Sequence, residues 1–439
     1  LQILCGPGNN GGDGRLLAIL AAGRGIPVAL YEVGGAARSS DAVQAAQRAA
    51  GAGLEALVYA GEALEPRGVI IDAMLGTGIR GAPRDTYAQA IRAAREAACP
   101  VLALDVPTGV DSDTGHAVGE AIVADWTVSF ITAKRGLYTG AGPAHGGAVS
   151  VDDLGVPPAA FDAAGHTWDV LDLDAELQHL PARDAGAHKG RFGRCLLIGG
   201  DVGMGGAIIL ASEAALRTGA GLARAATRAA NIPSLLARRP ECMTAAIGHR
   251  NDLEAQLPWA DALVIGPGLG QAPWGEQLLH AALAAGKPMI VDADALNLLA
   301  ARHGGPLPPG SVVTPHPGEA ARLLGVSAAE VQADRFSAAL ALAERLGAAV
   351  VLKGQGSLVV SGGRGWLCTA GNAGMASGGM GDVLSGVIGA LLAQGLGAAP
   401  AARLGTVLHS SAADRAAALL GVSALLASDV SDALGELLP

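Results

Sequence analysis

Short runs of hydrophobic residues alternate with amphipathic segments along the first third of the chain. The runs occupy residues 1–5, 28–33, 69–72, 101–105 and 127–131. Amphipathic segments fill residues 15–23, 40–50 and 86–98 between them. Short apolar runs that alternate with amphipathic segments are typical of buried strands in a three-layer α/β domain.

The pattern breaks down between residues 155 and 188, where Pro, Asp and Ala replace the apolar runs. A second series begins after this stretch, with apolar runs at residues 194–200, 262–265, 288–292, 311–314 and 349–352. The glycine-rich turns of the two series differ in sequence and spacing, so they do not form an internal repeat. We therefore predict two three-layer α/β domains, residues 1–155 and 188–439, joined by a linker at residues 156–187.

Composition agrees with two or three domains, because 439 residues exceed one ordinary core. The net charge of −10 and the absence of a basic run longer than Arg238-Arg239 argue against a nucleic-acid partner. The mean hydropathy of +0.37 raises the question of a membrane span. The best candidate, residues 383–402, contains several Gly and one Pro, so a buried helix is the better interpretation and no membrane partner is expected.

Five cysteines are dispersed along the chain without a CxxC pair, which is typical of reduced thiols in a cytoplasmic protein rather than of disulfides or a zinc site. The chain begins at Leu1, without Met, inside an apolar run. We therefore expect that additional N-terminal sequence precedes it.

A glycine-rich segment near the C-terminus, NAGMASGGMGDVLSG at residues 372–386, leads directly into an apolar helix. The backbone N–H groups of a helix start bind anions, and glycine allows a phosphate to approach the backbone. Asp382 stands where it can accept a proton from a hydroxyl that attacks the phosphate. The simpler alternative is that Asp382 only caps the helix.

The N-terminal turn contains a GxGxxG match at Gly6, Gly8 and Gly11, and Glu32 ends the next predicted strand. This arrangement permits a nicotinamide-dependent dehydrogenase. The hypothesis is weakened by Asp13, whose negative charge would lie beside the pyrophosphate.

Further polar residues fall at the carboxyl ends of predicted strands, where α/β sheets bind their ligands. Asp72, Asp105 and Thr108 are in this position. Oxygens from Asn10, Asp72 and Thr108 would suit a hard cation. The alternative for Asp72 and Asp105 is capping of the turns that follow them.

The motifs NNGGDG, DAMLGTGIRG and DVPTGVDSDTG of residues 1–150 resemble the N-terminal domain of the NAD(P)H-hydrate epimerase family. The resemblance implies a Rossmann-like domain with Asp105 as the catalytic residue. It implies that a potassium ion is held by Asn10, Asp72 and Thr108. The residues it implies for the hydrated nucleotide are Asn9, Asn10, Gly11, Gly12, Asp13, Gly76, Thr77, Gly78, Ile79 and Arg80. The family carries further helices before the NNGGDG strand, which the given sequence does not contain.

Several motifs of the second half stand in one order: GPGLG, DADALN, TPHPGE, KGQGS and the segment at residues 372–386. A GxxxxGK[ST] motif is absent, which excludes a P-loop. Together the motifs resemble the ADP/ATP-dependent NAD(P)H-hydrate dehydratases, which are ribokinase-like.

This second resemblance implies roles for particular residues. Asp382 would be catalytic, and Ala207, Gly268 and His316 would contact the hydrated nucleotide. The residues implied for ADP are Lys353, Gly354, Gln355, Gly356, Ser357, Asn372, Gly378, Gly379 and Gly381.

Both resemblances together imply an enzyme that repairs hydrated NADH and NADPH. It would interconvert the R and S epimers and dehydrate the S form at the expense of ADP, or ATP, with Mg2+ and K+ as cofactors. We also expect a homo-oligomer. Two alternatives remain: a small-molecule kinase of the thiazole or pyridoxal type, and a nucleotide-binding protein without catalysis.

Overall fold

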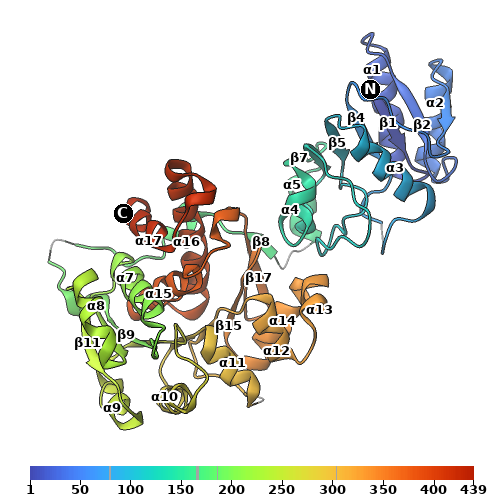
Figure 1. Ribbon diagram of the computed structural model, residues 1–439. Coiled ribbons are helices and arrows are strands. Elements are labelled where there is room, and N and C mark those ends of the chain that lie inside the picture. Colours follow the sequence, from blue (N-terminus) through green and yellow to red (C-terminus); the bar gives the residue numbers. More distant parts are fainter. Residues whose placement is uncertain (79–80, 165–167, 185, 303) are drawn as a thin grey trace. The chain divides into compact units, whose positions relative to one another are not determined.

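The computed structural model describes residues 1–78, 81–164, 168–184, 186–302 and 304–439 (Figure 1). The chain divides into two compact units, Leu1–Gly165 and His166–Pro439. Each unit contains a largely parallel sheet with helices packed against it, which confirms the predicted α/β class. Two predicted site residues, Ile79 and Arg80, lie outside the described residues.

The first unit is built on a seven-stranded, fully parallel sheet in the order β3-β2-β1-β4-β5-β6-β7. The strands are β1 (Gln2–Cys5), β2 (Ala29–Glu32), β3 (Ala56–Val58), β4 (Ile70–Ala73), β5 (Val101–Leu104), β6 (Trp126–Phe130) and β7 (Ala148–Asp152). The helices are α1 (Asn9–Ala22), α2 (Ser40–Gly51), α3 (Asp85–Glu96), α4 (Gly142–Gly146) and α5 (Pro158–Ala164). Strands β2 and β3 lie on one side of β1, and β4 to β7 lie on its other side. The strand order therefore reverses at β1, and a ligand-binding crevice is expected at the carboxyl end of this strand.

Alternate residues of the central strands face two separate cores. Ile3 and Cys5 pack with α1 and α2 on one face, whereas Leu4 and Ile70 pack with α3 on the other. Since both faces are covered, the strands read as continuous apolar runs, which is why the sequence predicts them correctly.

The second unit contains a ten-stranded sheet in the order β11-β10-β9-β12-β13-β14-β15-β16-β17-β8. The strands are β8 (Trp168–Val170), β9 (Arg194–Ile198), β10 (Leu222–Thr227), β11 (Met243–Ala246), β12 (Ala262–Ile265), β13 (Met289–Val291), β14 (Val312–Val313), β15 (Ala349–Leu352), β16 (Ser357–Ser361) and β17 (Arg364–Cys368). Strands β11 to β15 of this order run parallel, and β16 pairs antiparallel with both β15 and β17.

Helices cover both faces of this sheet. Their bounds are α6 (Leu173–Leu177), α7 (Gly205–Arg217), α8 (Ile232–Arg238), α9 (Arg250–Glu254), α10 (Pro273–Ala284), α11 (Ala293–Ala301), α12 (Pro317–Leu324), α13 (Ala328–Ala333), α14 (Arg335–Leu346), α15 (Met380–Ala393), α16 (Ala398–Leu420) and α17 (Ala427–Leu437). Helices α7, α15, α16 and α17 share the main apolar core with one face. Helix α15 is central to it, because its side chains from Val383 to Ala393 are buried.

The candidate span at residues 383–402 is divided between two helices, because α15 ends at Ala393 and α16 begins at Ala398. In the described part of the chain, no helix has both the length and the hydropathy needed to cross a membrane.

Part of the range predicted as a linker is structured. Strand β8 pairs with β17 at the edge of the second sheet, and Trp168 makes an edge-to-face contact with Phe336, with ring centroids 4.6 Å apart. Helix α6 packs against α16. The linker prediction is therefore wrong for these residues, because a strand and a helix this short leave little periodic signal in the sequence.

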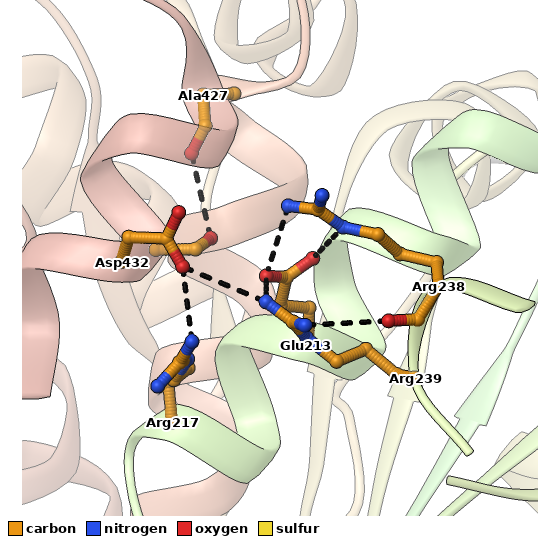
Figure 2. A network of polar contacts seen from close by, with 7 residues as sticks. Glu213, Arg217, Arg238, Arg239, Ala427 and Asp432 are labelled. Atoms are coloured by element: carbon orange, nitrogen blue, oxygen red, sulfur yellow. Dashed lines mark hydrogen bonds and ion pairs between the residues drawn. The ribbon is translucent and has the colours of Figure 1, made fainter. Parts of the chain in front are cut away.

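The basic pair noted in the sequence has a structural role. Figure 2 shows Arg238 and Arg239 converging on Glu213, whose side chain is fully buried in α7. The Arg238 Nε atom lies 3.0 Å from Glu213 Oε2. Asp432 of α17 accepts a hydrogen bond from Arg217 and pairs with Arg239 at 3.5 Å. These contacts join α7, α8 and α17 at the end of the unit.

Candidate active sites

A cavity of about 830 Å³ opens at the carboxyl ends of β1, β4, β5 and β6 in the first unit. It lies at the point where the strand order reverses, as expected for a ligand site. The predicted site residues that line it are Asn9, Asn10, Asp13, Gly76, Thr77, Gly78 and Asp105. The sequence therefore predicted seven of the residues that line this cavity.

Gly11 and Gly12 lie in the first turn of α1, as Asn9 and Asn10 do, but they are not among the residues that line the cavity. A Cβ atom at residue 11 would stand 1.9 Å from the carbonyl oxygen of Gly6, and one at residue 12 would stand 3.2 Å from Ala42 Cα. These glycines allow the helix to pack closely on the preceding turn and on α2. That packing accounts for both residues without a ligand contact.

Asp105 is held in an unusual position at the cavity wall. Its φ angle is +67°, a left-handed conformation that costs free energy for a residue other than glycine. Lys134 Nζ lies 2.5 Å from Asp105 Oδ1 and also donates to the carbonyl of Phe130 at 2.5 Å. The lysine lines the same cavity, so it is a functional candidate that the sequence reasoning missed.

A second carboxylate faces this pair. Burial, and next the negative charge of Asp105, raise the pKa of Asp13 above its ordinary value. The cavity thus contains two different carboxyl groups. Asp105 is strained and paired with a lysine, whereas Asp13 has a raised pKa, which disfavours its ionised form. Such a combination suits proton transfer in both directions.

Of the three residues predicted to hold potassium, Asp72 and Thr108 contact each other, and Asn10 lines the cavity. Asp72 is completely buried and accepts hydrogen bonds from Thr108 N at 2.7 Å and from Thr108 Oγ1 at 2.8 Å. Burial raises its pKa to about 6, against the effect of the bonds from Thr108 and Met74. Asn10 Oδ1 is buried without a hydrogen-bond partner, although its Nδ2 donates to Leu104 O. A buried amide oxygen without a hydrogen-bond partner is compatible with a cation ligand.

Under the dehydrogenase hypothesis Glu32 would bind the ribose, but its side chain is paired with an arginine. Glu32 forms an ion pair at 3.0 Å with Arg15, whose side chain is fully buried. Arg15 also donates to the carbonyl oxygens of Gly6 and Gly11. Glu32 therefore stabilises the glycine turn indirectly, through its ion pair with Arg15.

The motifs of the second unit converge at one edge of its sheet. Strands β9, β12, β13, β14 and β15 are adjacent and parallel, so the turns that follow them lie side by side. Asp292 follows β13 and is 1% exposed. It accepts a hydrogen bond from Lys353 Nζ at 2.9 Å and one from Ser385 Oγ at 2.7 Å. These bonds tie the ends of β13 and β15 to α15.

Asp382 lies in the first turn of α15, one turn before Ser385. The N-cap residue, Gly379, has a φ angle of +92°, which glycine adopts without strain. A Cβ atom at Gly381 would stand 3.3 Å from Lys353 Nζ, so the helix start lies close to this lysine. Burial, and then Asp292, raise the pKa of Asp382 to about 7, while Lys353 lowers it. Its carboxylate is thus tuned to accept a proton near neutral pH.

Lys353 is held by acidic neighbours other than Asp382. Glu319 Oε2 lies 3.9 Å from Lys353 Nζ, in addition to the Asp292 contact. Burial lowers the pKa of Lys353, but Asp292, then Glu319 and last Asp382 outweigh this and raise its pKa overall. The lysine therefore remains a cation at the helix start.

The residues predicted to contact the hydrated nucleotide lie around the same edge. A Cβ atom at Gly268 would stand 3.1 Å from Ala207 Cβ, so these two residues are close neighbours. His316 is the N-cap of α12, and its Nδ1 atom accepts hydrogen bonds from Gly318 N and Glu319 N. Burial, and next the charge of Lys353, lower the pKa of His316. The imidazole is therefore held neutral, in one orientation.

The residues predicted to bind ADP occupy two segments. The first segment follows β15 and contains Lys353, Gly354, Gln355 and Gly356, with Ser357 as the first residue of β16. The second segment contains Asn372, Gly378, Gly379 and Gly381, which precede or begin α15. Asn372 caps a short helix and donates to Asp414 at 2.8 Å. Lys353 and Gly381 are close neighbours and bring these two segments together at the site.

A buried arginine that the sequence reasoning missed supports the first of these segments. Arg335, which is 1% exposed, donates to the carbonyl oxygens of Leu352, Lys353 and Gly356. Burial lowers its pKa to about 10. The guanidinium therefore fixes the shape of the loop and adds positive charge beneath it.

A carboxylate in the first turn of a glycine-led helix, beside strand-end turns and without a P-loop, places the second unit in the ribokinase-like class of α/β domains. Sequence comparison identifies the family. The profile of NAD(P)H-hydrate dehydratases matches residues 195–436, and that of the YjeF-related protein N-terminus matches residues 1–136. The chain belongs to the family of bifunctional NAD(P)H-hydrate repair enzymes.

Relatives match both units at once. The bifunctional NAD(P)H-hydrate repair enzyme Nnr of Coxiella burnetii is 45% identical over 442 residues, spanning 98% of this chain and 88% of that protein. The Escherichia coli protein of the same name is 45% identical over 447 residues, spanning 98% and 84%.

A solved structure matches the second unit. The ADP/ATP-dependent NAD(P)H-hydrate dehydratase of Bacillus subtilis, co-crystallised with ATP and Mg2+, aligns with a TM-score of 0.55 and 32% identity. The alignment covers 61% of this chain and 96% of that structure. These matches favour the repair-enzyme hypothesis over the small-molecule kinase.

Proposed function

We propose that the protein repairs hydrated NADH and NADPH through two activities. The first unit interconverts the R and S epimers of the hydrate, and the second dehydrates the S epimer at the expense of a nucleotide. The observation that carries the proposal is the grouping of Asp382, Lys353 and the glycine-led start of α15 at one sheet edge.

The dehydration begins with phosphoryl transfer. The hydrate carries a hydroxyl group on the ring carbon next to the ring nitrogen, and hydroxide is a poor leaving group. Asp382 takes the proton of this hydroxyl as its oxygen attacks the terminal phosphorus of the nucleotide, whose own phosphate bond breaks. The backbone N–H groups at Gly379 and Gly381 and the ammonium of Lys353 stabilise the charge on the transferring group.

The elimination that follows needs little from the protein. The ring nitrogen donates its electron pair and expels phosphate, and the neighbouring carbon then loses a proton to the released phosphate, which restores the ring double bond. The products are NAD(P)H, phosphate and the shortened nucleotide. His316, Gly268 and Ala207 hold the nicotinamide end of the hydrate in this proposal, and the neutral imidazole adds no charge beside the developing ring cation.

The epimerisation uses the first unit. The hydroxyl of the hydrate leaves as water after it receives a proton, and a water molecule adds to the other face of the ring. Asp105 serves as the acid and base for these steps, and Lys134 keeps its carboxylate oriented. Asn10, Asp72 and Thr108 would hold potassium, whose charge offsets the buried Asp72 carboxylate.

The nucleotide donor is ADP in our proposal, with AMP as its product, and Mg2+ accompanies the nucleotide as part of the phosphoryl donor. The B. subtilis structure supports nucleotide use, since it was co-crystallised with ATP and Mg2+. A cytoplasmic location and a homo-oligomeric state complete the proposal.

The test is recovery of reduced-nicotinamide absorbance from purified hydrates. Separate reactions should contain the S or R epimer, with ADP, ATP or no nucleotide. We expect nucleotide-dependent recovery from both epimers, with AMP and phosphate formed from ADP. A stable phosphorylated product would instead indicate a kinase, and recovery with ATP alone would reverse the choice of donor.

A further inference from the structure

A carboxylate of α16, Asp414, binds the start of the glycine-rich segment that leads into α15. Its Oδ2 atom accepts a hydrogen bond from Gly371 N at 2.7 Å, and its Oδ1 atom accepts one from Asn372 Nδ2 at 2.8 Å. Gly371 packs on the same helix, since a Cβ atom there would stand 3.5 Å from Ser410 Cβ. The segment therefore begins at a point that is fixed to a helix of the main core, and neither proposed reaction uses this carboxylate.

The carboxylate also decides how the amide of Asn372 is oriented. An ionised carboxylate only accepts hydrogen bonds, so the Nδ2 group of Asn372 must face Asp414. The Oδ1 atom is thereby turned towards the chain that follows, where it accepts a hydrogen bond from Gly374 N at 3.0 Å. The carbonyl oxygen of Asn372 accepts another from Met375 N at 3.1 Å. Both ends of the side-chain amide thus bind the protein itself, and the turn at residues 372–375 is closed by these bonds.

The same helix also reaches the other end of the segment. His409 is 4% exposed, and its imidazole forms a hydrogen bond with the backbone of Met380, the first residue of α15. Burial, and next the charge of Lys353, lower the pKa of His409 to about 4, so the ring is neutral. Between these two anchors, residues 376–378 are exposed. Helix α16 therefore fixes both ends of the segment and leaves its middle open to a ligand.

We propose that Asp414 is a positioning residue for the nucleotide: it holds Asn372 and the turn that follows, so that the glycine backbone before Asp382 is ordered before the nucleotide binds. The inference rests on the proposed function of the second unit. Glycine loses more conformational entropy on ordering than other residues do, and ordering the segment in advance removes that cost from binding. Asn372 then acts on ADP through the shape of the loop and not through direct contact.

The experiment uses the full chain and measures the Kd for ADP and for ATP by calorimetry, together with kcat and KM for the S hydrate of NADH. The variants are Asp414→Asn, Asn372→Asp and the double variant, and the control is Asp174→Asn, at an exposed carboxylate of α6. Asp414→Asn places an NH2 group where two donors need acceptors, and Asn372→Asp places two carboxylates face to face. We expect each single change to raise the Kd for ADP about 5- to 50-fold. The KM for the hydrate at saturating nucleotide should stay within about two-fold of the wild-type value.

The double variant separates positioning from direct contact. It exchanges the two groups, so the new amide at residue 414 can accept from Gly371 N and donate to the new carboxylate at residue 372, which can still accept from Gly374 N. We expect it to recover most of the affinity for ADP, to within about five-fold of the wild type. A side chain in direct contact with the nucleotide would not be rescued in this way, since the exchange brings the negative charge to residue 372.

An unchanged Kd for ADP in both single variants would overturn the inference. Additive losses in the double variant would overturn it as well, because Asn372 would then act independently of Asp414. Thermal melts check that the variants fold, and if Asp414→Asn does not, Asn372→Asp breaks the same hydrogen bond from the other side. The wild type tests the proposed function separately: a wild-type chain that does not convert the S hydrate with a nucleotide refutes that function, whereas the comparison of Kd values does not depend on the hydrate.

Discussion

The two units pair the carboxylate that we propose as catalytic with a lysine in different ways. In the first unit Lys134 contacts Asp105 directly, at 2.5 Å. In the second, Lys353 is bound to Asp292 at 2.9 Å, and Asp382 keeps a pKa of about 7. The difference corresponds to the two proposed reactions. A reversible epimerisation needs a well-oriented carboxylate, whereas attack by a hydroxyl group needs a stronger base beside a separate cation.

Both units also support a glycine-containing loop with a buried arginine. Arg15 donates to carbonyl oxygens of the first glycine turn, and Arg335 donates to those of the loop after β15. In each case a buried guanidinium donates hydrogen bonds to the carbonyl groups of the loop. These hydrogen bonds keep each loop in one shape, which the proposed binding of an anionic nucleotide requires.

The largest expected effect comes from Asp382→Asn, which keeps the size of the side chain and removes the base. We expect dehydration of the S epimer to fall by roughly 10²-fold or more. Conversion of R to S, followed by nuclear magnetic resonance, should continue at the wild-type rate. Near-normal dehydration would refute the role of Asp382, and Asp174→Asn, an exposed carboxylate on α6, serves as the matched control.

The reciprocal change is Lys134→Met in the first unit. It removes the partner of Asp105 and leaves a side chain of similar length, so epimerisation should slow by about 10- to 100-fold. Dehydration of the S epimer should not change, because Lys134 belongs to the other unit. A loss of both activities would instead indicate that the variant is misfolded, which circular dichroism can check.

The sequence predicted these two sites unevenly. Strand ends and glycine turns mark Asp72, Asp105 and Asp382, because parallel strands bring successive turns to one edge. Lys134 and Arg335 look like ordinary surface charges in the sequence, and only tertiary packing brings them to their loops. Ser385 follows Asp382 by one helical turn, so its place on the same face could have been predicted.

The strands were also predicted unevenly from the sequence. The central strands are apolar on both faces and were predicted correctly, whereas β10 is rich in alanine and was missed. Strand β8 is only three residues long and finds its partner, β17, far along the chain. Such pairings depend on long-range contacts, which local periodicity does not report.

A third prediction concerns pH. The folded-state pKa of Asp382, about 7, lies above the ordinary value of 3.8. The dehydration rate should therefore rise as pH increases through 7, when the base becomes ionised.

The same shift predicts a cost in stability. A raised pKa means that the folded state holds the proton more tightly, so its contribution to stability is complete below pH 3.8 and is lost as pH rises towards 7. Asp382→Asn has no such loss. Its melting temperature should exceed that of the wild type by roughly 2–6 °C at pH 8 and by less at pH 5. An equal difference at both pH values would contradict the assigned shift.

The smallest expected effect on activity concerns where the second unit begins. A fragment of residues 166–439 keeps β8 and α6, whereas one that begins at residue 186 loses both. The shorter fragment lacks the contact between Trp168 and Phe336 and the ion pair between Asp169 and Arg364, so its melting temperature should be lower by roughly 3–8 °C. Both fragments should dehydrate the S epimer with the same kcat, because β8 is at the far edge of the sheet from β9 and β12. A loss of kcat in the shorter fragment alone would show that β8 and α6 support the site as well as the fold. Consumption of the R epimer by either fragment should be no faster than spontaneous epimerisation, since Asp105 and Lys134 are absent from both.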